Sequence, residues 1–297
     1  MGEEEKVPLL LDTDIGSDID DAVCLSYLLN QPRCELLGVT TVSGEAEKRA
    51  ALADAIIRAK DEELEIPVHP GTEKPLLVEQ RQTRAQQASV LEEWPHREDF
   101  QPGRAAEFAR RQIRERPGEV TLLAVGPLTN VALLFALDPE IPSLLDRLVL
   151  MNGRFFSGRA EWNARLDPHA AAMVYHAPVD ELIAVGLDVT LECRAAAPEA
   201  RGKLKGRELD LVREMAEVWF ERSEEIVFHD PLAGAVVFEE ELCSYERAEV
   251  KVELVGERSA GMTFLEKEGA GRRKVAKEVR KEDFLDHLWS TLNPNSS

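Results

Sequence analysis

Short, uninterrupted apolar runs separated by longer segments with helical periodicity are the feature that most constrains the fold of this chain. The runs cover Val7–Asp14, Glu35–Thr41, Ile66–His69, Val120–Val125, Leu148–Met151 and Leu182–Leu187. Strands of a parallel sheet that helices cover on both faces show this continuous pattern, whereas half-exposed strands alternate. We therefore predict an α/β fold with a mostly parallel, doubly wound (Rossmann-like) sheet and helices on both faces.

The segments between and after these runs predict the remaining elements. Helices are expected over Asp20–Asn30, Glu45–Lys60 and Glu282–Leu292, and Ala248–Val255 alternates as a half-buried strand does. Gln80–Gln101 has no clear period, which predicts a long loop. Helical spacing also relates several apolar residues, a stripe best explained by core packing: Leu209, Val212, Ala216, Trp219 and Ile226. No linker or repeat divides the chain, so residues 1–297 are expected to form a single domain.

Composition excludes several classes of protein. A net charge of −20 argues against a nucleic-acid-binding protein, and no apolar run is long enough to cross a membrane. The acidic start differs from the basic start of a signal peptide, and four scattered cysteines suit reduced thiols in a cytoplasmic protein. One basic cluster is best explained as a solvated face, with a phosphate site as the weaker alternative: Arg272, Arg273, Lys274, Lys277, Arg280 and Lys281.

The most informative segment for function is an acidic run directly after the first predicted strand. Five aspartates fall within ten residues, from Asp12 to Asp21. Ligands bind at the carboxyl ends of the strands in open α/β sheets, and crowded carboxylates repel one another unless a cation joins them. Ca²⁺ and Mg²⁺ prefer oxygen ligands of this kind. We therefore expect a divalent metal site here, rather than surface charge with a helix cap.

Two known kinds of acidic site begin with aspartates spaced as in this run. An EF-hand loop starting at Asp12 needs glycine at its sixth place and glutamate at its twelfth, but these places hold Ser17 and Val23. A haloacid-dehalogenase-type phosphatase would use Asp12 as nucleophile, but no convincing later acidic pair and lysine complete such a site. The phosphatase is therefore kept as the less favoured alternative.

Four ordered motifs resemble the inosine-uridine nucleoside hydrolase family. The acidic run is similar to the family's opening Asp-x-Asp-x-Gly…Asp-Asp-Ala, and Gly126–Asn130 resembles its Gly-Pro-Leu-Thr-Asn turn. Met151–Pro168 resembles its Met-Gly-Gly…Glu-Phe-Asn…Asp-Pro block, and His229–Ala233 its late His-Asp-Pro-x-Ala. Four matches in the family's order, spread over most of the chain, are far more specific than any one of them.

The resemblance implies an enzyme, a nucleoside N-ribohydrolase, in which water displaces the base from C1′ of a ribonucleoside, a reaction of purine and pyrimidine salvage. It implies a Ca²⁺ cofactor bound by Asp14, Asp21, Asp230 and the backbone carbonyl of Val125. Asp14 would also be the general base, and His229 the acid that protonates the leaving base.

The resemblance also implies which residues bind the substrate, a small nucleoside. Asp20 would bind the 2′-hydroxyl, although Asp18 could share this role because the motif is longer than usual. Glu161 and Asn163 would hold the far side of the sugar, including its 5′-hydroxyl, and Met151 would pack against the sugar. Family members are often homo-oligomers, dimers or tetramers, so the same is expected here.

Three departures from the family pattern leave the substrate base open. Glu45 stands where the family usually has asparagine, which predicts an extra carboxylate near the ribose. The family's His-Gly pair is missing from Gln80–Trp94, and Asn152 replaces a frequent glycine. We expect hydrogen-bonding groups for the base from Gln80–Trp94 and from Trp219–His229. A second hypothesis is therefore that the chain is a homologue that binds a ribosyl ligand or a metal and has little catalytic turnover.

Overall fold

The computed structural model describes residues 6–266 and 269–294. The acidic start of the chain, on which the expectation about a signal peptide rests, lies outside these residues apart from Lys6. Within the described ranges, no helix is both long and apolar enough to cross a membrane.

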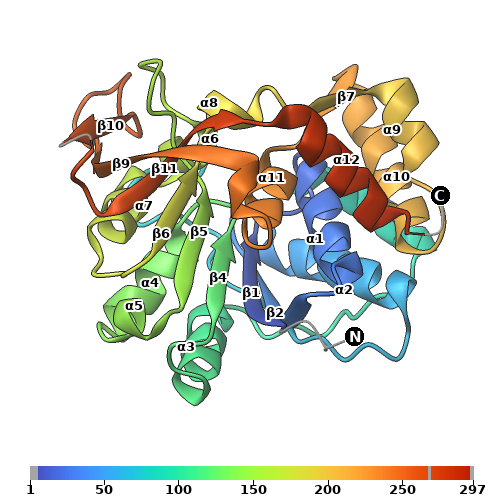
Figure 1. The fold of residues 1–297 in the computed structure, drawn as a ribbon. Helices are drawn as coiled ribbons and strands as arrows, with labels where there is room; N and C mark the ends of the chain where they lie inside the picture. Colours follow the sequence, from blue (N-terminus) through green and yellow to red (C-terminus); the bar gives the residue numbers. More distant parts are fainter. Residues whose placement is uncertain (1–5, 267–268, 295–297) are drawn as a thin grey trace.

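One nine-stranded sheet organises the chain, in the order β10-β9-β11-β6-β5-β4-β1-β2-β3 (Figure 1). Neighbouring strands from β3 to β11 are parallel, whereas β9 and β10 pair antiparallel at one edge. This confirms the predicted α/β fold. The strands are β1 (Val7–Thr13), β2 (Cys34–Thr41), β3 (Val68–Pro70), β4 (Thr121–Ala124), β5 (Arg147–Met151), β6 (Leu182–Val185), β9 (Cys243–Val252), β10 (Thr263–Glu266) and β11 (Arg273–Val279).

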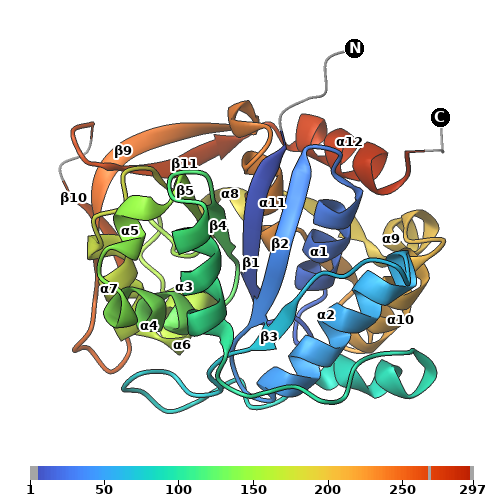
Figure 2. The same ribbon diagram turned by 90° about the horizontal axis from the view of Figure 1, so that it is seen from below.

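Helices cover both faces of this sheet, as Figures 1 and 2 show. One face packs against α1 (Asp20–Asn30), α2 (Ala46–Lys60), α10 (Glu208–Phe220), α11 (His229–Val236) and α12 (Lys281–Leu292). The other packs against α3 (Ala105–Glu115), α4 (Thr129–Leu137), α5 (Ile141–Leu144) and α7 (Pro168–His176). In β1, Leu9 and Leu11 enter the first core and Leu10 the second. Successive side chains of a strand point to opposite faces, which explains the continuous apolar runs.

Several short elements complete the structure. They are the 3₁₀ helices η1 (Gln86–Glu93) and η2 (Glu240–Leu242), helices α6 (Trp162–Leu166), α8 (Leu187–Thr190) and α9 (Ala197–Lys203), and a separate two-stranded sheet of β7 (Arg194–Ala196) and β8 (Glu225–Val227).

The structure corrects three details of the sequence-based assignment: the end of one helix and the bounds of two strands. Helix α10 ends at Phe220. Ile226 lies outside this helix, in β8, where it pairs with Ala195 of β7. Ile226 lies seven residues after Trp219, about two helical turns, so its spacing from Trp219 is the same as that of two residues on one face of a helix. The strand that begins at Leu182 ends at Val185. Leu187, the last residue of the predicted strand, begins α8 instead. Strand β9 covers Cys243–Val252, which is earlier than predicted.

The predicted long loop contains a 3₁₀ helix, η1, which the absence of a 3.6-residue period concealed. Ala85 and Gln87 are buried, and the Gln87 N–H donates to the Gly16 carbonyl at 3.0 Å. This segment, residues 80–93, is named the lid segment below. It packs against the turn that follows β1, so it lies at the carboxyl edge of the sheet.

Arg273 is buried, so the prediction of a solvated face is wrong for this member of the basic cluster. Its guanidinium donates to the carbonyls of Tyr175, Ala177 and Val179, at the end of α7 and just beyond it. The last carbonyls of a helix have no partner within the helix, and this arginine supplies one from β11. The residue is therefore structural.

Three adjacent parallel strands end at the same edge of the sheet. Asp12 of β1 is in register with Ala124 of β4, which is in register with Leu150 of β5. The next residues of the chain place Asp14, Val125 and Met151 side by side beyond this edge, where open α/β sheets bind their ligands.

Candidate active site

A cavity of about 420 Å³ opens at this carboxyl edge. Its floor is formed by buried residues that the family motifs supply: Asp14, Asp20, Asp21, Val125, Met151, Glu161, Asn163 and Asp230. Its mouth is formed by more exposed residues of the lid segment, of the last turn of α10 and of the region after it: Arg81, Thr83, Arg84, Gln86, Trp219 and Arg222. All nine residues that the sequence assigned to metal, catalysis or substrate, His229 included, therefore line one cavity.

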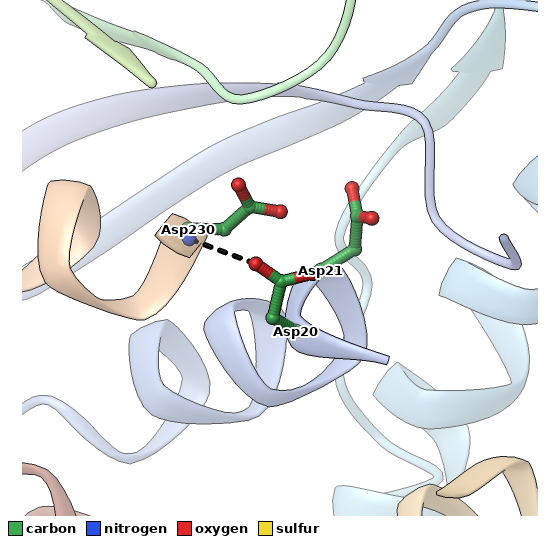
Figure 3. A group of neighbouring side chains, drawn as sticks. All are labelled: Asp20, Asp21 and Asp230. Carbon is green, nitrogen blue, oxygen red and sulfur yellow. Dashed lines mark hydrogen bonds between the residues drawn. The ribbon is translucent and has the colours of Figure 1, made fainter. Parts of the chain in front are cut away.

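Three of the buried lining residues form a cluster of carboxylates, which Figure 3 shows. Asp20 and Asp21 begin α1, and Asp230 lies in the first turn of α11. Among the described residues, these three form the group whose carboxylate oxygens approach within 4.8 Å of one another. One oxygen of Asp20 accepts hydrogen bonds from the backbone N–H groups of His229 and Asp230, each at 3.1 Å. This contact joins the beginnings of α1 and α11.

The electrostatics of the cluster favour a bound cation. Burial raises the pKa of Asp20, Asp21 and Asp230 well above the usual range for a carboxyl, and repulsion among the neighbouring aspartates raises it further. Burial raises the pKa of Asp14 as well, against the attraction of Arg49. Ionised carboxylates at this density require a positive partner, and a divalent cation with oxygen ligands provides one.

Asp14 lies beside this cluster but is held by different contacts. Its backbone N–H donates to Asp21 Oδ1 at 3.1 Å, and its own carboxylate accepts from the Gln82 side-chain amide. The other side of Gln82 accepts from the Trp162 indole N–H at 2.8 Å. Gln82 therefore connects the lid segment to Asp14 and to the indole that stands where the family usually has phenylalanine.

Arg49 holds the backbone around the site and was missed by the sequence analysis. It is fully buried, and its guanidinium and Nε donate to the carbonyls of Asp14, Ile15, Gly44 and Arg84. The signal was present in the sequence, because an arginine stands among the alanines and isoleucines on the inner face of α2. A buried arginine that satisfies several carbonyls marks a point where separate segments meet.

Glu161 and Asn163 occupy the far wall of the floor. Glu161 caps α6 by accepting from the N–H groups of Asn163 and Ala164, and it accepts a third bond from Gly153. Burial raises its pKa to about 7 in spite of these three donors. The Asn163 amide donates to the Val125 carbonyl at 2.7 Å. The structure thus brings the predicted substrate-binding residues next to the predicted carbonyl ligand.

His229 faces the cavity from the start of α11. Its Nδ1 lies 2.7 Å from Thr190 Oγ1, a partner that the sequence analysis did not identify. Burial, aided by repulsion from Arg194, lowers the pKa of His229 to about 4. The imidazole is therefore neutral near pH 7, not partly protonated as its usual pKa suggested. If Thr190 donates to Nδ1, the proton of the neutral ring is on Nε2.

Two carboxylates that the sequence analysis considered lie outside the cavity lining. Asp12 accepts from Asn130 at 2.7 Å and from Thr40 at 2.6 Å, which joins β1, β2 and α4. This internal position does not support Asp12 as the nucleophile of a phosphatase. The Glu45 carboxylate binds Lys48 and the Ala85 N–H, so it anchors the lid segment and is not the predicted extra carboxylate near the ribose.

Comparison with known proteins identifies the family of the chain. The model of a family described as inosine-uridine preferring nucleoside hydrolase matches residues 9–286. The non-specific ribonucleoside hydrolase RihC of Salmonella enteritidis PT4 is 32% identical over 275 residues, which are 88% of each chain. Uridine nucleosidase 1 of Arabidopsis thaliana is 30% identical over 276 residues, 86% of this chain and 80% of the relative.

Solved structures show the same fold. A purine-preferring ribonucleoside hydrolase from Gardnerella vaginalis superposes with a TM-score of 0.84 at 22% identity, covering 97% of this chain and 98% of that one. An inosine-uridine preferring nucleoside hydrolase from Bacillus anthracis superposes with a TM-score of 0.80 at 22% identity, covering 97% and 99%. By sequence and by fold, the chain belongs to the inosine-uridine preferring nucleoside hydrolase family.

Proposed function

We propose that this nucleoside hydrolase is calcium-dependent and cleaves the N-glycosidic bond of ribonucleosides to give ribose and free base. The observation that carries the proposal is the buried cluster of Asp20, Asp21 and Asp230, next to Asp14, at the floor of a cavity of about 420 Å³. The relatives named as ribonucleoside hydrolase and uridine nucleosidase support the same reaction.

The donor set fits a hard divalent cation. Asp14, Asp21 and Asp230 offer carboxylate oxygens and Val125 offers its backbone carbonyl, and no thiol or imidazole ligand is needed. Asp20 shares the cluster, so it can contact either the metal or the ribose. When bound, Ca²⁺ supplies ligand positions for the ribose hydroxyls and for water, and it makes that water more acidic.

Asp14 accepts a proton from the attacking water in the proposed reaction. The water oxygen bonds to C1′ while the C1′–N bond breaks. The electron pair of the C1′–N bond leaves with the nucleobase. Gln82 holds the Asp14 carboxylate from one side, and Arg49 holds the Asp14 backbone from the other. Both contacts fix the Asp14 carboxylate relative to the sugar, which lowers the entropic cost of reaching the transition state.

His229 donates a hydrogen bond to the departing base. With Nδ1 facing the Thr190 hydroxyl, Nε2–H of the neutral ring is the donor, and it stabilises the electron pair that the base takes from the C1′–N bond until solvent water protonates the base. Its pKa of about 4 leaves the ring without the extra proton that the family resemblance assigned to an acid. Glu161, Asn163 and Met151 position the sugar, and the carboxylates of the floor stabilise the positive charge that develops on it in an oxocarbenium-like transition state.

Release of free ribose from a panel of purine and pyrimidine nucleosides tests the proposal. We expect ribose from at least one nucleoside, loss of activity with a chelator and recovery with Ca²⁺. p-Nitrophenyl phosphate in parallel tests the phosphatase, which predicts phosphate release that Asp12→Asn abolishes. Metal and ligand binding without ribose release would instead support the weakly active homologue.

Two further expectations stay proposals. We propose that the protein is a homo-oligomer, a dimer or tetramer, which light scattering measures. We also propose a cytoplasmic enzyme, because the four cysteines are free thiols and three of them are buried, as suits a reducing compartment.

A further inference from the structure

Three arginines stand at the mouth of the cavity, in a chain whose net charge is −20. Arg81 and Arg84 belong to the lid segment, and Arg222 follows α10; all three are exposed. The floor holds the aspartates described above and Glu161, and the half-buried Asp18 also lines the cavity. The cavity is therefore polarised, with an acidic floor and a basic mouth.

Arg222 is held in place by two contacts. Its guanidinium lies 4.7 Å from the centre of the Trp219 ring and donates to the Ser17 carbonyl. Ser17 in turn donates through its hydroxyl to the Arg84 carbonyl at 3.3 Å, and Arg49 donates to that same carbonyl at 3.0 Å. The lid segment and the region after α10 thus meet at Ser17, and both Arg84 and Arg222 line the cavity.

The charges of these arginines are not neutralised by close partners. Among the described residues, no carboxylate forms an ion pair with Arg81, Arg84 or Arg222, although Asp18 attracts Arg222 from a greater distance. Other exposed arginines of the chain do form such pairs, including Arg201 with Glu217 at 2.7 Å. Guanidinium groups that line a cavity and form no close ion pair bind anionic, oxygen-rich groups well.

We propose that the mouth selects nucleosides whose base carries a negative charge near neutral pH, and that Arg222 contacts this base. The proposal rests on the proposed function, because ribose at the acidic floor directs the glycosidic bond, and hence the base, toward the mouth. Xanthosine represents this substrate class, since its base is readily deprotonated. Inosine is the neutral comparison, because it lacks only the second oxygen on the ring.

A phosphate on the sugar is the other anionic group that arginines recognise. It would sit on the 5′ carbon, which the proposed binding mode places near Glu161, a buried carboxylate that would repel it. The base is therefore the favoured source of the negative charge, and inosine 5′-monophosphate serves as the test of the alternative.

The experiment compares Arg222→Gln with wild type on xanthosine, inosine and inosine 5′-monophosphate. Arg201→Gln is the matched control, because Arg201 also contacts an aromatic ring, that of Phe220 at 4.6 Å, but does not line the cavity. We expect Arg222→Gln to raise the KM for xanthosine relative to that for inosine by about tenfold, the size of one charge-assisted hydrogen bond at a partly exposed site. Because the charge acts on bound substrate and transition state alike, the change should fall on KM and not on kcat. Added salt should reduce the wild-type preference for xanthosine, and Arg201→Gln should leave it intact.

An unchanged ratio of KM values in Arg222→Gln overturns the proposal, as does an Arg222-dependent preference for the monophosphate over xanthosine. If wild type releases ribose from no nucleoside, the proposed function has failed, and calorimetry with free xanthine and hypoxanthine then decides the present inference. A preference for xanthine that Arg222→Gln removes supports it, and equal binding of the two bases refutes it.

Discussion

Between Asp12 and Asp21, identical side chains have different roles because neighbouring residues of a strand or turn point in different directions. Asp12, still in β1, bonds inward to Thr40 and Asn130. Asp14, beyond the strand, lines the cavity, and Asp20 reaches the start of α11. At the residue scale, the chemistry of each aspartate follows from its place in the local backbone.

Asp14→Asn should fold normally and lose nearly all nucleosidase activity. The substitution is almost isosteric, but it deletes the proton acceptor and one negative charge of the metal site. General-base catalysis alone accounts for about 10²–10⁴-fold in rate. Circular dichroism and ribose release at saturating calcium measure both expectations, and near wild-type turnover would exclude Asp14 as the base.

His229→Ala should separate substrates by the quality of their leaving group. The base of inosine leaves poorly unless its developing negative charge is stabilised, so hydrolysis of inosine should fall by about 10²–10³-fold without the Nε2–H donor. Hydrolysis of p-nitrophenyl riboside should be spared, because p-nitrophenolate leaves readily as an anion. Thr190→Val, which removes the partner of Nδ1, should show the same pattern more weakly. Equal loss on both substrates would mean that His229 positions the sugar or the metal.

At the scale of elements, the site depends on contacts between segments far apart in the sequence. Arg49 of α2 joins the turn after β1 to the lid segment, and Gln82 of that segment reaches Asp14. Gly126, after β4, allows close approach, because a Cβ there would lie 2.7 Å from Asp14 Oδ1. The position of Asp14, the candidate general base, is therefore set by three other segments: α2, the lid segment and the turn after β4.

Arg49→Met should destabilise the protein by about 3 kcal/mol or more, because several buried carbonyls lose their donor. It should also reduce activity, since the Asp14 backbone is no longer held. Arg58→Met is the control on the same helix. The half-exposed Arg58 pairs with Asp54, which keeps the Arg97 N–H as a second donor, so this change should cost about 1 kcal/mol or less. Urea unfolding measures the difference, and equal effects of the two variants would contradict the role given to Arg49.

At the scale of the whole molecule, one sheet includes strands from both ends of the chain. Strand β11 pairs with β6, and β1 lies three places from β6 in the same sheet. We propose on this basis that residues 1–297 form a single domain. A single domain should unfold in one calorimetric transition, with equal calorimetric and van't Hoff enthalpies.

Calcium should raise the temperature of that transition. A ligand that binds only the folded state at 100 times its Kd adds about 2.7 kcal/mol to the free energy of unfolding, which for a chain of this size shifts Tm upward by roughly 5 °C. Asp21→Asn, which removes one carboxylate of the cluster, should abolish most of the shift. The same shift in this variant, or none in the wild type, would contradict a calcium site at the cluster.

The sequence alone determined the class of fold, the position of the main strands and the family. These features depend on local patterns: continuous apolar runs, helical periods and four ordered motifs. It also named the aspartates at the end of β1 and, through resemblance to the family, nine of the residues that line the cavity. Short or irregular elements such as η1 and β8 were not predicted correctly, because they have too few residues to show a period.

Only the tertiary structure decided which of these aspartates converge and what holds them. Asp230 meets Asp20 across 210 positions of the chain, and Arg49, Gln82 and Thr190 acquire their roles through contacts with distant segments. The pKa of His229 likewise depends on its burial, which no local pattern reports. Periodicity records which face of an element is buried, but hydrogen bonds and charges act through space, so their partners are known only once the chain is folded.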